Sequence, residues 1–291
     1  MSVISLTWHR HTWWLSLNAM SRSIVPVSVS VIRANGSDAA NYLQGQCSAD
    51  LNKNTKAHAL WLNRKGRVLA HTLISKEPDQ SFLIVCPHLA AADAISIMSS
   101  NLIADDVTLV DETSQWKSAI VWGDSEMSFT NDIRFWSSPR TSFASWQILF
   151  PNNARVLGTE SEVTFLEKNR IESGIPSVPE DCGVNEFPQE CGLDNWVSYN
   201  KGCYLGQEVM ARIQSMGSLR RSLRKITATQ PLQRDLELKS SRSGKTIGMV
   251  KSCIGKTGLA LVSIECQEGA TLDSTLGPIV IGGLAKLPEH A

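Results

Sequence analysis

The segment KGCYLGQE, residues 201–208, places one cysteine between two glycines, directly after a lysine. Glycine tolerates the tight backbone of a loop, so N–H groups there can turn toward a ligand or a thiolate. The charge of Lys201 would favour the thiolate of Cys203. The segment therefore indicates a reactive or metal-ligating cysteine. The alternative is a small cysteine packed in a turn, since free cysteine is among the most buried residue types.

Partners for that sulfur are harder to find in the sequence. A catalytic Cys-His pair needs a histidine that the fold brings near, and His58, His71 and His88 are available without a supporting motif. Cys182 and Cys191 precede the motif cysteine with the spacing C-x8-C-x11-C. Zinc and cluster motifs instead keep paired cysteines about two to four residues apart. We therefore predict no autonomous metal site.

Glu172 lies in the segment NRIESGIP, residues 169–176, where a helix is expected to end before glycine and proline. A carboxylate buried there can accept paired hydrogen bonds from an amino-pyrimidine ring, the edge that a pterin presents. The alternative is a solvated glutamate at a helix terminus, because glutamates are mostly exposed.

Basic residues gather between positions 201 and 225, where Glu208 is the one acidic residue. Such a cluster could bind the phosphates of RNA or another polyanion. On alternate strand positions the same side chains would form a solvated face. The residues are Lys201, Arg212, Arg220, Arg221, Arg224 and Lys225.

Composition limits the class of protein. The 291 residues suffice for two or three domains, and 28 Lys+Arg balance 28 Asp+Glu, so any anion site must be local. Seven scattered cysteines and no secretory signal predict a reduced, cytoplasmic protein, and no apolar run approaches the roughly 20 residues of a membrane-spanning helix. The first 22 residues are basic and lack acidic residues, so a mitochondrial-matrix targeting peptide is the alternative, although three tryptophans fit it poorly.

Apolar spacing predicts an α+β protein with a separate C-terminal β-barrel. We expect an extension of unclear role at 1–23, a mixed α and β region at 24–217, which the family resemblance described below implies to be folate-binding, and a barrel domain at 218–291. A helix after residue 36 should be capped by Ser37 or Asp38, and a hairpin should turn at Asn63–Gly66. We expect strands at 24–36, in the hairpin 56–75, at 81–87, and in short runs within 107–151 and after 218. The expected helices are 37–51, 88–103 and 161–174. The segment 174–195 should be irregular.

The segment 170–224 resembles the signature of the YgfZ family, folate-binding proteins related to the glycine cleavage T-protein, an aminomethyltransferase. The similarity is carried by KGCYLGQEV with the following AR, by RIESGIP and by FPQECGL, in order and spacing. GSDAANYLQGQCSADL and LNRKGRVLAHTLIS resemble the family's opening helix and first hairpin. The resemblance covers roughly residues 25–225 and matches the C-terminal barrel loosely.

The resemblance implies an aminomethyltransferase-like fold, tetrahydrofolate or a derivative in a central channel, and a role in assembling or repairing iron–sulfur proteins. It also implies a link to tRNA modification, with tRNA as a candidate partner beside iron–sulfur client or assembly proteins. Cys203 would act as nucleophile or transient ligand, and Glu172 would grip the pterin. The remaining motif residues implied for the cofactor site are Lys201, Gly202, Tyr204, Gly206, Gln207, Glu208 and Arg212.

One departure bears on the reaction. T-proteins carry an Asp-Asp pair on the strand after the first hairpin, and Ala70-His71 stands at that place here. Neither residue replaces a carboxylate that orients an amine beside a folate nitrogen. An accessory function in iron–sulfur assembly is therefore favoured over aminomethyl transfer, and a folate-binding adaptor without chemistry remains the third hypothesis.

Overall fold

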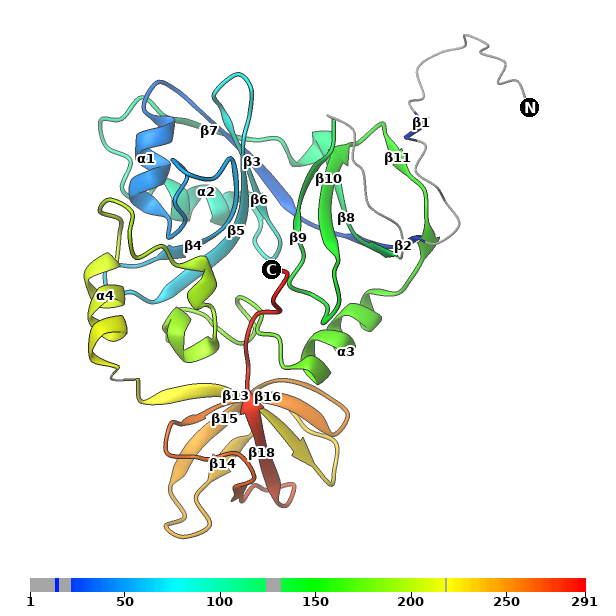
Figure 1. Cartoon of the computed structure of the whole chain (residues 1–291), viewed down its shortest axis with the longest axis vertical. Helices are drawn as coiled ribbons and strands as arrows, with labels where there is room; N and C mark the ends of the chain where they lie inside the picture. Colours follow the sequence, from blue (N-terminus) through cyan, green and yellow to red (C-terminus); the bar gives the residue numbers. More distant parts are fainter. Residues whose placement is uncertain (1–13, 16–21, 124–131, 218) are drawn as a thin grey trace.

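The computed structural model describes residues 14–15, 22–123, 132–217 and 219–291. Two sheets with their helices form the upper part of the molecule in Figure 1, and a β-barrel lies below them. Most of the expected extension at 1–23 lies outside the described residues. Its described strand β1 (Trp14–Leu15) pairs in parallel with β11 (Arg155–Val156).

The first sheet has the strand order β4-β5-β6-β3-β7 and carries helices α1 and α2. The expected hairpin is confirmed, because the amide of Gly66 donates to the carbonyl of Asn63 (2.8 Å) at its turn. Apolar side chains of the strands pack against both helices around Leu43 and Met98. The elements are β3 (Ser30–Asn35), α1 (Ala39–Gln46), β4 (Lys56–Leu62), β5 (Val68–Lys76), β6 (Phe82–Cys86), α2 (Ala91–Ser99) and β7 (Thr108–Asp111).

The expected side-chain cap of α1 is wrong. Asp38 occupies the N-cap position without a capping hydrogen bond. Its carboxylate accepts instead from the amide of Asp106 (2.8 Å), and the hydroxyl of Ser37 donates to the carboxylate of Asp106 (2.9 Å). Both polar side chains thus hold the loop before β7, a long-range use that local sequence does not reveal.

The second sheet has the order β12-β2-β8-β10-β9. The single strand expected at 24–36 is in fact two strands, and β2 pairs with β8 in this sheet while β3 belongs to the first. Trp136 and Leu149 of this sheet contact Leu73 and Val85 of the first, which joins the two sheets. The elements are β2 (Arg22–Val27), η1 (Thr113–Gln115), β8 (Trp116–Gly123), β9 (Arg134–Ser137), β10 (Trp146–Pro151), β12 (Thr159–Glu160) and α3 (Val163–Ser173).

A connecting segment, residues 174–206, leads from α3 toward the barrel. Gly174 ends α3 in the left-handed conformation (φ 78°), as expected for a helix C-terminus. The segment is largely irregular, with the short helices η2 (Pro188–Cys191) and η3 (Asp194–Trp196). Helix α4 (Gln207–Met216) follows it and is absent from the expected elements, although Val209, Met210 and Ile213 have helical spacing and pack on the core.

The C-terminal strands form a six-stranded sheet around a core of their own. The expected run of short strands after residue 218 is confirmed. After the last strand the chain returns to the centre of the molecule, where its C-terminal end lies between the three parts (Figure 1). The strands are β13 (Arg221–Ala228), β14 (Glu237–Lys239), β15 (Thr246–Ile254), β16 (Thr257–Ser263), β17 (Thr271–Leu272) and β18 (Ile279–Leu284).

Candidate functional site

Cys203 is exposed at the tip of the loop that precedes α4. The alternative interpretation, in which Cys203 is a small residue packed in a turn, is therefore wrong. The loop needs Gly206, which has φ 85°, because a Cβ there would lie 2.9 Å from the carbonyl oxygen of Asn63. The loop thus rests directly on the β4–β5 turn, and the thiol stands on a supported surface.

Lys201 points the other way. Its ammonium is buried and donates to the carbonyls of Cys47 (2.8 Å) and Ala49 (2.5 Å). Burial lowers the pKa of Lys201, and the charges of Cys47 and Asp50 partly oppose that shift. The interpretation that this ammonium acts on Cys203 has no support in the geometry, because its hydrogen bonds anchor the loop to the segment after α1.

The other motif residues divide into supports and surface groups. Tyr204 is buried with its ring 5.0 Å from the Lys201 ammonium, and burial raises the pKa of its hydroxyl. Gln207 begins α4, and its amide is 3.5 Å from the carbonyl of Lys201. Gly202, Glu208 and Arg212 are exposed with Cys203.

Glu172 does not lie where the sequence analysis expects it. Its side chain is 50% exposed, and its carboxylate is 3.9 Å from the ammonium of Lys168, one turn earlier on α3. The expected burial is wrong because α3 turns Leu166, Arg170 and Ile171 inward. The structure does not bring Glu172 together with the motif loop.

The basic cluster is likewise divided. Arg221 donates to Glu190 (3.0 Å), and Arg224 donates to the carbonyl of Gly282 (3.4 Å). Arg212 and Arg220 are exposed. The six basic side chains therefore do not form one face for a polyanion.

Two histidines that the sequence analysis left without a motif meet on the first sheet. His58 of β4 and His71 of β5 have nearly parallel rings, with an angle of 5° between their planes, and His58 Nδ1 lies 3.0 Å from His71 Nε2. The indole of Trp196 covers both, with ring centroids 4.1 Å from His71 and 4.9 Å from His58. The three rings form a stack, called here the imidazole–indole stack.

Hydrogen bonds fix the tautomers of the stack. His58 Nε2 lies 2.9 Å from the carbonyl of Ser137, which can only accept, so that nitrogen carries the proton. His58 Nδ1 is then the acceptor for His71 Nε2–H. Burial lowers the pKa of His58 to about 4 and that of His71 well below its ordinary value, so both imidazoles are neutral at pH 7.

A cavity of about 490 Å³ opens beside the stack. His58 and Trp196 form its inner wall, and Lys53 and Lys56 stand among its other lining residues. The indole N–H of Trp196 is buried and has no hydrogen-bond partner within the described part of the chain. Strand pairing places His58 and His71 diagonally across β4 and β5, so only the hairpin register, which sequence patterns leave open, could have revealed the stack.

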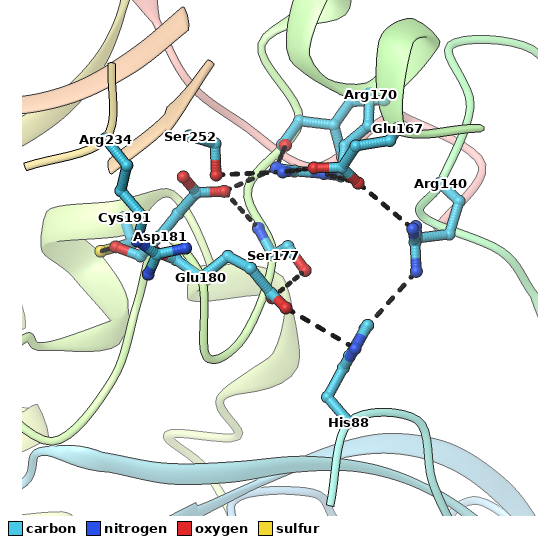
Figure 2. Close-up of polar contacts among 11 residues, drawn as sticks. His88, Arg140, Glu167, Arg170, Ser177, Glu180, Asp181, Cys191, Arg234 and Ser252 are labelled. Atoms are coloured by element: carbon cyan, nitrogen blue, oxygen red, sulfur yellow. Dashed lines mark hydrogen bonds and ion pairs between the residues drawn. The ribbon is translucent and has the colours of Figure 1, made fainter. Parts of the chain in front are cut away.

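A second group of titratable side chains lies where the three parts meet (Figure 2). Arg170 of α3 is fully buried and donates to Asp181 (2.5 Å), to Ser252 of β15 (3.1 Å) and to Glu167. Desolvation opposes the charge of Arg170, but its hydrogen bonds to the Glu167 carboxylate and the charge of Asp181 raise its pKa.

His88 connects this group to the first sheet, as Figure 2 shows. Its Nε2 is 3.5 Å from Arg140, so it accepts, and its Nδ1 is 3.7 Å from Glu180. Arg140 also donates to Glu167 (3.3 Å). Burial lowers the pKa of His88, against the opposing charge of Glu180. The side chains labelled in Figure 2 are here called the junction network. They are His88, Arg140, Glu167, Arg170, Ser177, Glu180, Asp181, Cys191, Arg234 and Ser252.

The remaining cysteines are thiols in the interior or partly covered. Cys253 is half-buried, and the other five are buried. Burial raises the pKa of the Cys86 thiol to about 12. Across residues 14–15, 22–123, 132–217 and 219–291, no cluster of three or more His, Cys, Asp or Glu side chains is arranged to hold a metal ion. In the same ranges no helix combines the length and apolar character needed to cross a membrane.

The sequence is similar to proteins of known families. The family described as the CAF17 C-terminal β-barrel domain matches residues 220–285. The mitochondrial iron–sulfur cluster assembly factor IBA57 of Mus musculus is 24% identical, covering 89% of this chain and 82% of its own length. The tRNA-modifying protein YgfZ of Sodalis glossinidius is 24% identical over 85% of each chain. The resemblance to the YgfZ family is confirmed.

The solved structures agree on the fold. The glycine cleavage system aminomethyltransferase T of Bartonella henselae superposes with a TM-score of 0.76, covering 93% of this chain and 89% of that one, at 14% identity. The predicted α+β, aminomethyltransferase-like fold with a C-terminal β-barrel is therefore confirmed. At that identity the likeness establishes the architecture alone.

Proposed function

We propose that this protein is an accessory factor of iron–sulfur protein assembly that presents Cys203 as a transient ligand or nucleophile. The observation that carries the proposal is the exposed thiol on an anchored loop, in a chain whose relatives are named as iron–sulfur cluster assembly factors. A thiolate is the soft ligand that cluster iron prefers. One thiol cannot complete a cluster's ligand set, so partner proteins supply the rest.

The loop suits this task mechanically. The buried ammonium of Lys201 holds the start of the loop on the segment after α1, and the amide of Leu205 donates to the carbonyl of Gly45 (3.1 Å). Cys203 lies between these two anchors with its side chain outside. A ligand held on a rigid element loses little entropy when it binds a partner's iron.

We further propose that tetrahydrofolate or a derivative binds in the cavity beside the imidazole–indole stack. The volume falls within the range of small-molecule sites, and the ring of Trp196, which lines the cavity, offers an aromatic surface to a pterin. Lys53 and Lys56 can pair with the carboxylates of the glutamate tail. When bound, the reduced pterin supplies one-carbon or redox chemistry. The chain's residues bind and orient it.

Aminomethyl transfer is disfavoured by the chemistry of the stack. His71 stands at the position of the T-protein carboxylate pair, but its Nε2–H is committed to His58 and its ring is neutral. A neutral donor cannot polarise an amine as a carboxylate does.

Two finer points accompany the proposal. A mitochondrial site of action is supported by the names of the IBA57 relatives, and the cytoplasmic location stays a prediction. A tRNA partner is supported by the name of the YgfZ relative and by the exposed Arg212 and Arg220, which could contact phosphates beside the motif loop.

The test is Cys203→Ser in cells that lack the native protein, with the activity of a cluster-dependent enzyme as readout. Serine is nearly isosteric, so the variant should fold normally but fail to restore activity, because it lacks a soft ligand. Cys253→Ser, at a half-buried thiol in the barrel, is the matched control and should restore activity fully. Full complementation by Cys203→Ser would reject the assigned role of this thiol.

A further inference from the structure

The segment after the last barrel strand, residues 285–291, crosses from the barrel to the centre of the molecule (Figure 1). The amide of Ala285 donates to the carbonyl of Leu223 (2.9 Å), and that of Lys286 donates to the carbonyl of Gly174 (3.1 Å). The segment, called here the C-terminal strap, therefore touches both the barrel and the end of α3 before it reaches the cavity.

The connecting segment is shaped to receive the strap. Gly192 has φ 70°, and a Cβ there would lie 2.3 Å from the carbonyl oxygen of Ala285. Leu287 is buried in the same apolar cluster as Trp196 and Tyr204. A position that only glycine can fill, opposite the strap's backbone, shows that the strap's path is built into the fold.

The strap ends on the strand that also orients the stack. His290 Nε2 donates to the carbonyl of Ser138 (3.1 Å), and His58 Nε2 donates to the neighbouring carbonyl of Ser137 (2.9 Å). Two adjacent carbonyls at the end of β9 thus hold one histidine of the stack and one of the strap. Ala291 then lines the cavity together with His58 and Trp196.

We propose that the C-terminal strap is a structural wall of the ligand cavity and that it tightens binding by fixing the imidazole–indole stack. This inference rests on the proposed function for the identity of the ligand. The cavity is open with the strap in place, so the strap is a wall and does not plug the site. Because the strap leaves the barrel and Ala291 lines the cavity, it also connects the barrel to the ligand cavity.

The test compares the full chain with a variant that stops after Leu287 and with His290→Ala. The probe is 5-formyltetrahydrofolate, and calorimetry measures its affinity. Loss of the hydrogen bond from His290 should weaken binding about threefold to tenfold, and loss of residues 288–291 should weaken it further. Glu289→Ala, whose exposed side chain lies on the same segment, is the control and should bind normally.

A second measurement does not depend on folate. Diethylpyrocarbonate modifies neutral imidazoles, and mass spectrometry can follow its reaction with His58 and His71 in each variant. Both sites should react several times faster once the strap is shortened or His290 is replaced. Faster modification in variants of a chain that binds no folate would support the wall and reject the folate proposal. Unchanged modification rates, or equal or tighter folate binding without the strap, would contradict the proposal that the strap is a wall of the cavity. If the shortened chain fails to fold, His290→Ala provides the test.

Discussion

The junction network and the imidazole–indole stack are two groups of titratable side chains near the centre of one molecule, and they use their partners differently. In the network, Arg170 is fully buried, yet its guanidinium donates to carboxylates, a hydroxyl and the carbonyl of Ile175. In the stack, two neutral rings share one hydrogen bond, and the N–H of Trp196 has no partner among the described residues.

The difference separates a structural cluster from a binding site. Buried charges are tolerated when they are paired, and the charges of the network are paired with one another, although Asp181 Oδ1 and Arg140 Nε have no hydrogen-bond partner in the described part of the chain. Neutral rings cost less to bury than charges do, and rings that line an open cavity leave a surface that a ligand can cover. Density of titratable groups alone would have pointed to the network instead.

The largest effect is expected from Arg170→Met, which tests the structural role of the junction network. Removing the arginine leaves Asp181 buried and uncompensated, so we expect a loss of about 3–5 kcal/mol in the free energy of unfolding. Urea unfolding measures it. Ser252→Ala removes one neutral partner of the same guanidinium and should cost only about 0.5–1.5 kcal/mol.

The same two variants test whether the junction network is structural and the imidazole–indole stack binds the ligand. At temperatures where they stay folded, both should bind 5-formyltetrahydrofolate as the parent chain does, since the network lies outside the cavity's lining. Selective loss of affinity in Ser252→Ala would place the network in the ligand site and erase the distinction drawn above.

A smaller effect is expected from pH acting on the stack. The unfolded chain protonates His58 near its ordinary pKa of 6.5, whereas the folded chain resists protonation until about pH 4. The unfolded state therefore binds more protons in this window, and stability falls as the pH drops from above 6.5 toward 4. Between pH 7.5 and pH 5 the loss from this half-buried ring should be about 1–2 kcal/mol.

Unfolding at both pH values, in the parent chain and in His58→Gln, isolates this contribution. Glutamine can still donate to the carbonyl of Ser137 but does not titrate, so the pH-dependent loss should shrink by the stated amount. An unchanged pH dependence would mean that His58 is solvated and that the stack does not exclude water as described.

The sequence predicted the elements whose signals are local. The glycines around Cys203 correctly indicated an exposed loop, and the turn at Asn63–Gly66 and the end of α3 at Gly174 follow from the backbone preferences of single residues. Directions of long side chains were not predictable in the same way. Lys201 precedes Cys203 by two residues, yet its ammonium reaches carbonyls more than 150 positions away in the chain.

The imidazole–indole stack shows the same limit. Its three rings come from two strands and a short helix, so it exists only after the hairpin register and the path of the connecting segment are fixed. The C-terminal strap is set by a contact between Gly192 and Ala285, which no periodic pattern marks. Tertiary contacts of this kind determine where the cavity lies and which residues line it, and local propensity does not encode them.

The smallest expected effect distinguishes two candidate folate sites, the end of α3 at Glu172 and the cavity beside the imidazole–indole stack. Glu172→Ala removes an exposed side chain whose ion pair with Lys168 is solvent-screened, so stability and affinity for 5-formyltetrahydrofolate should each change by less than about 0.5 kcal/mol. A buried carboxylate that grips the pterin would instead cost about 2–3 kcal/mol of binding. Calorimetry on Glu172→Ala separates these values easily, and Lys168→Ala serves as the matched control because it removes the same ion pair from the other side. A large loss in Glu172→Ala alone would mean that ligand binding turns this side chain inward, and it would move the folate site from the stack to the end of α3.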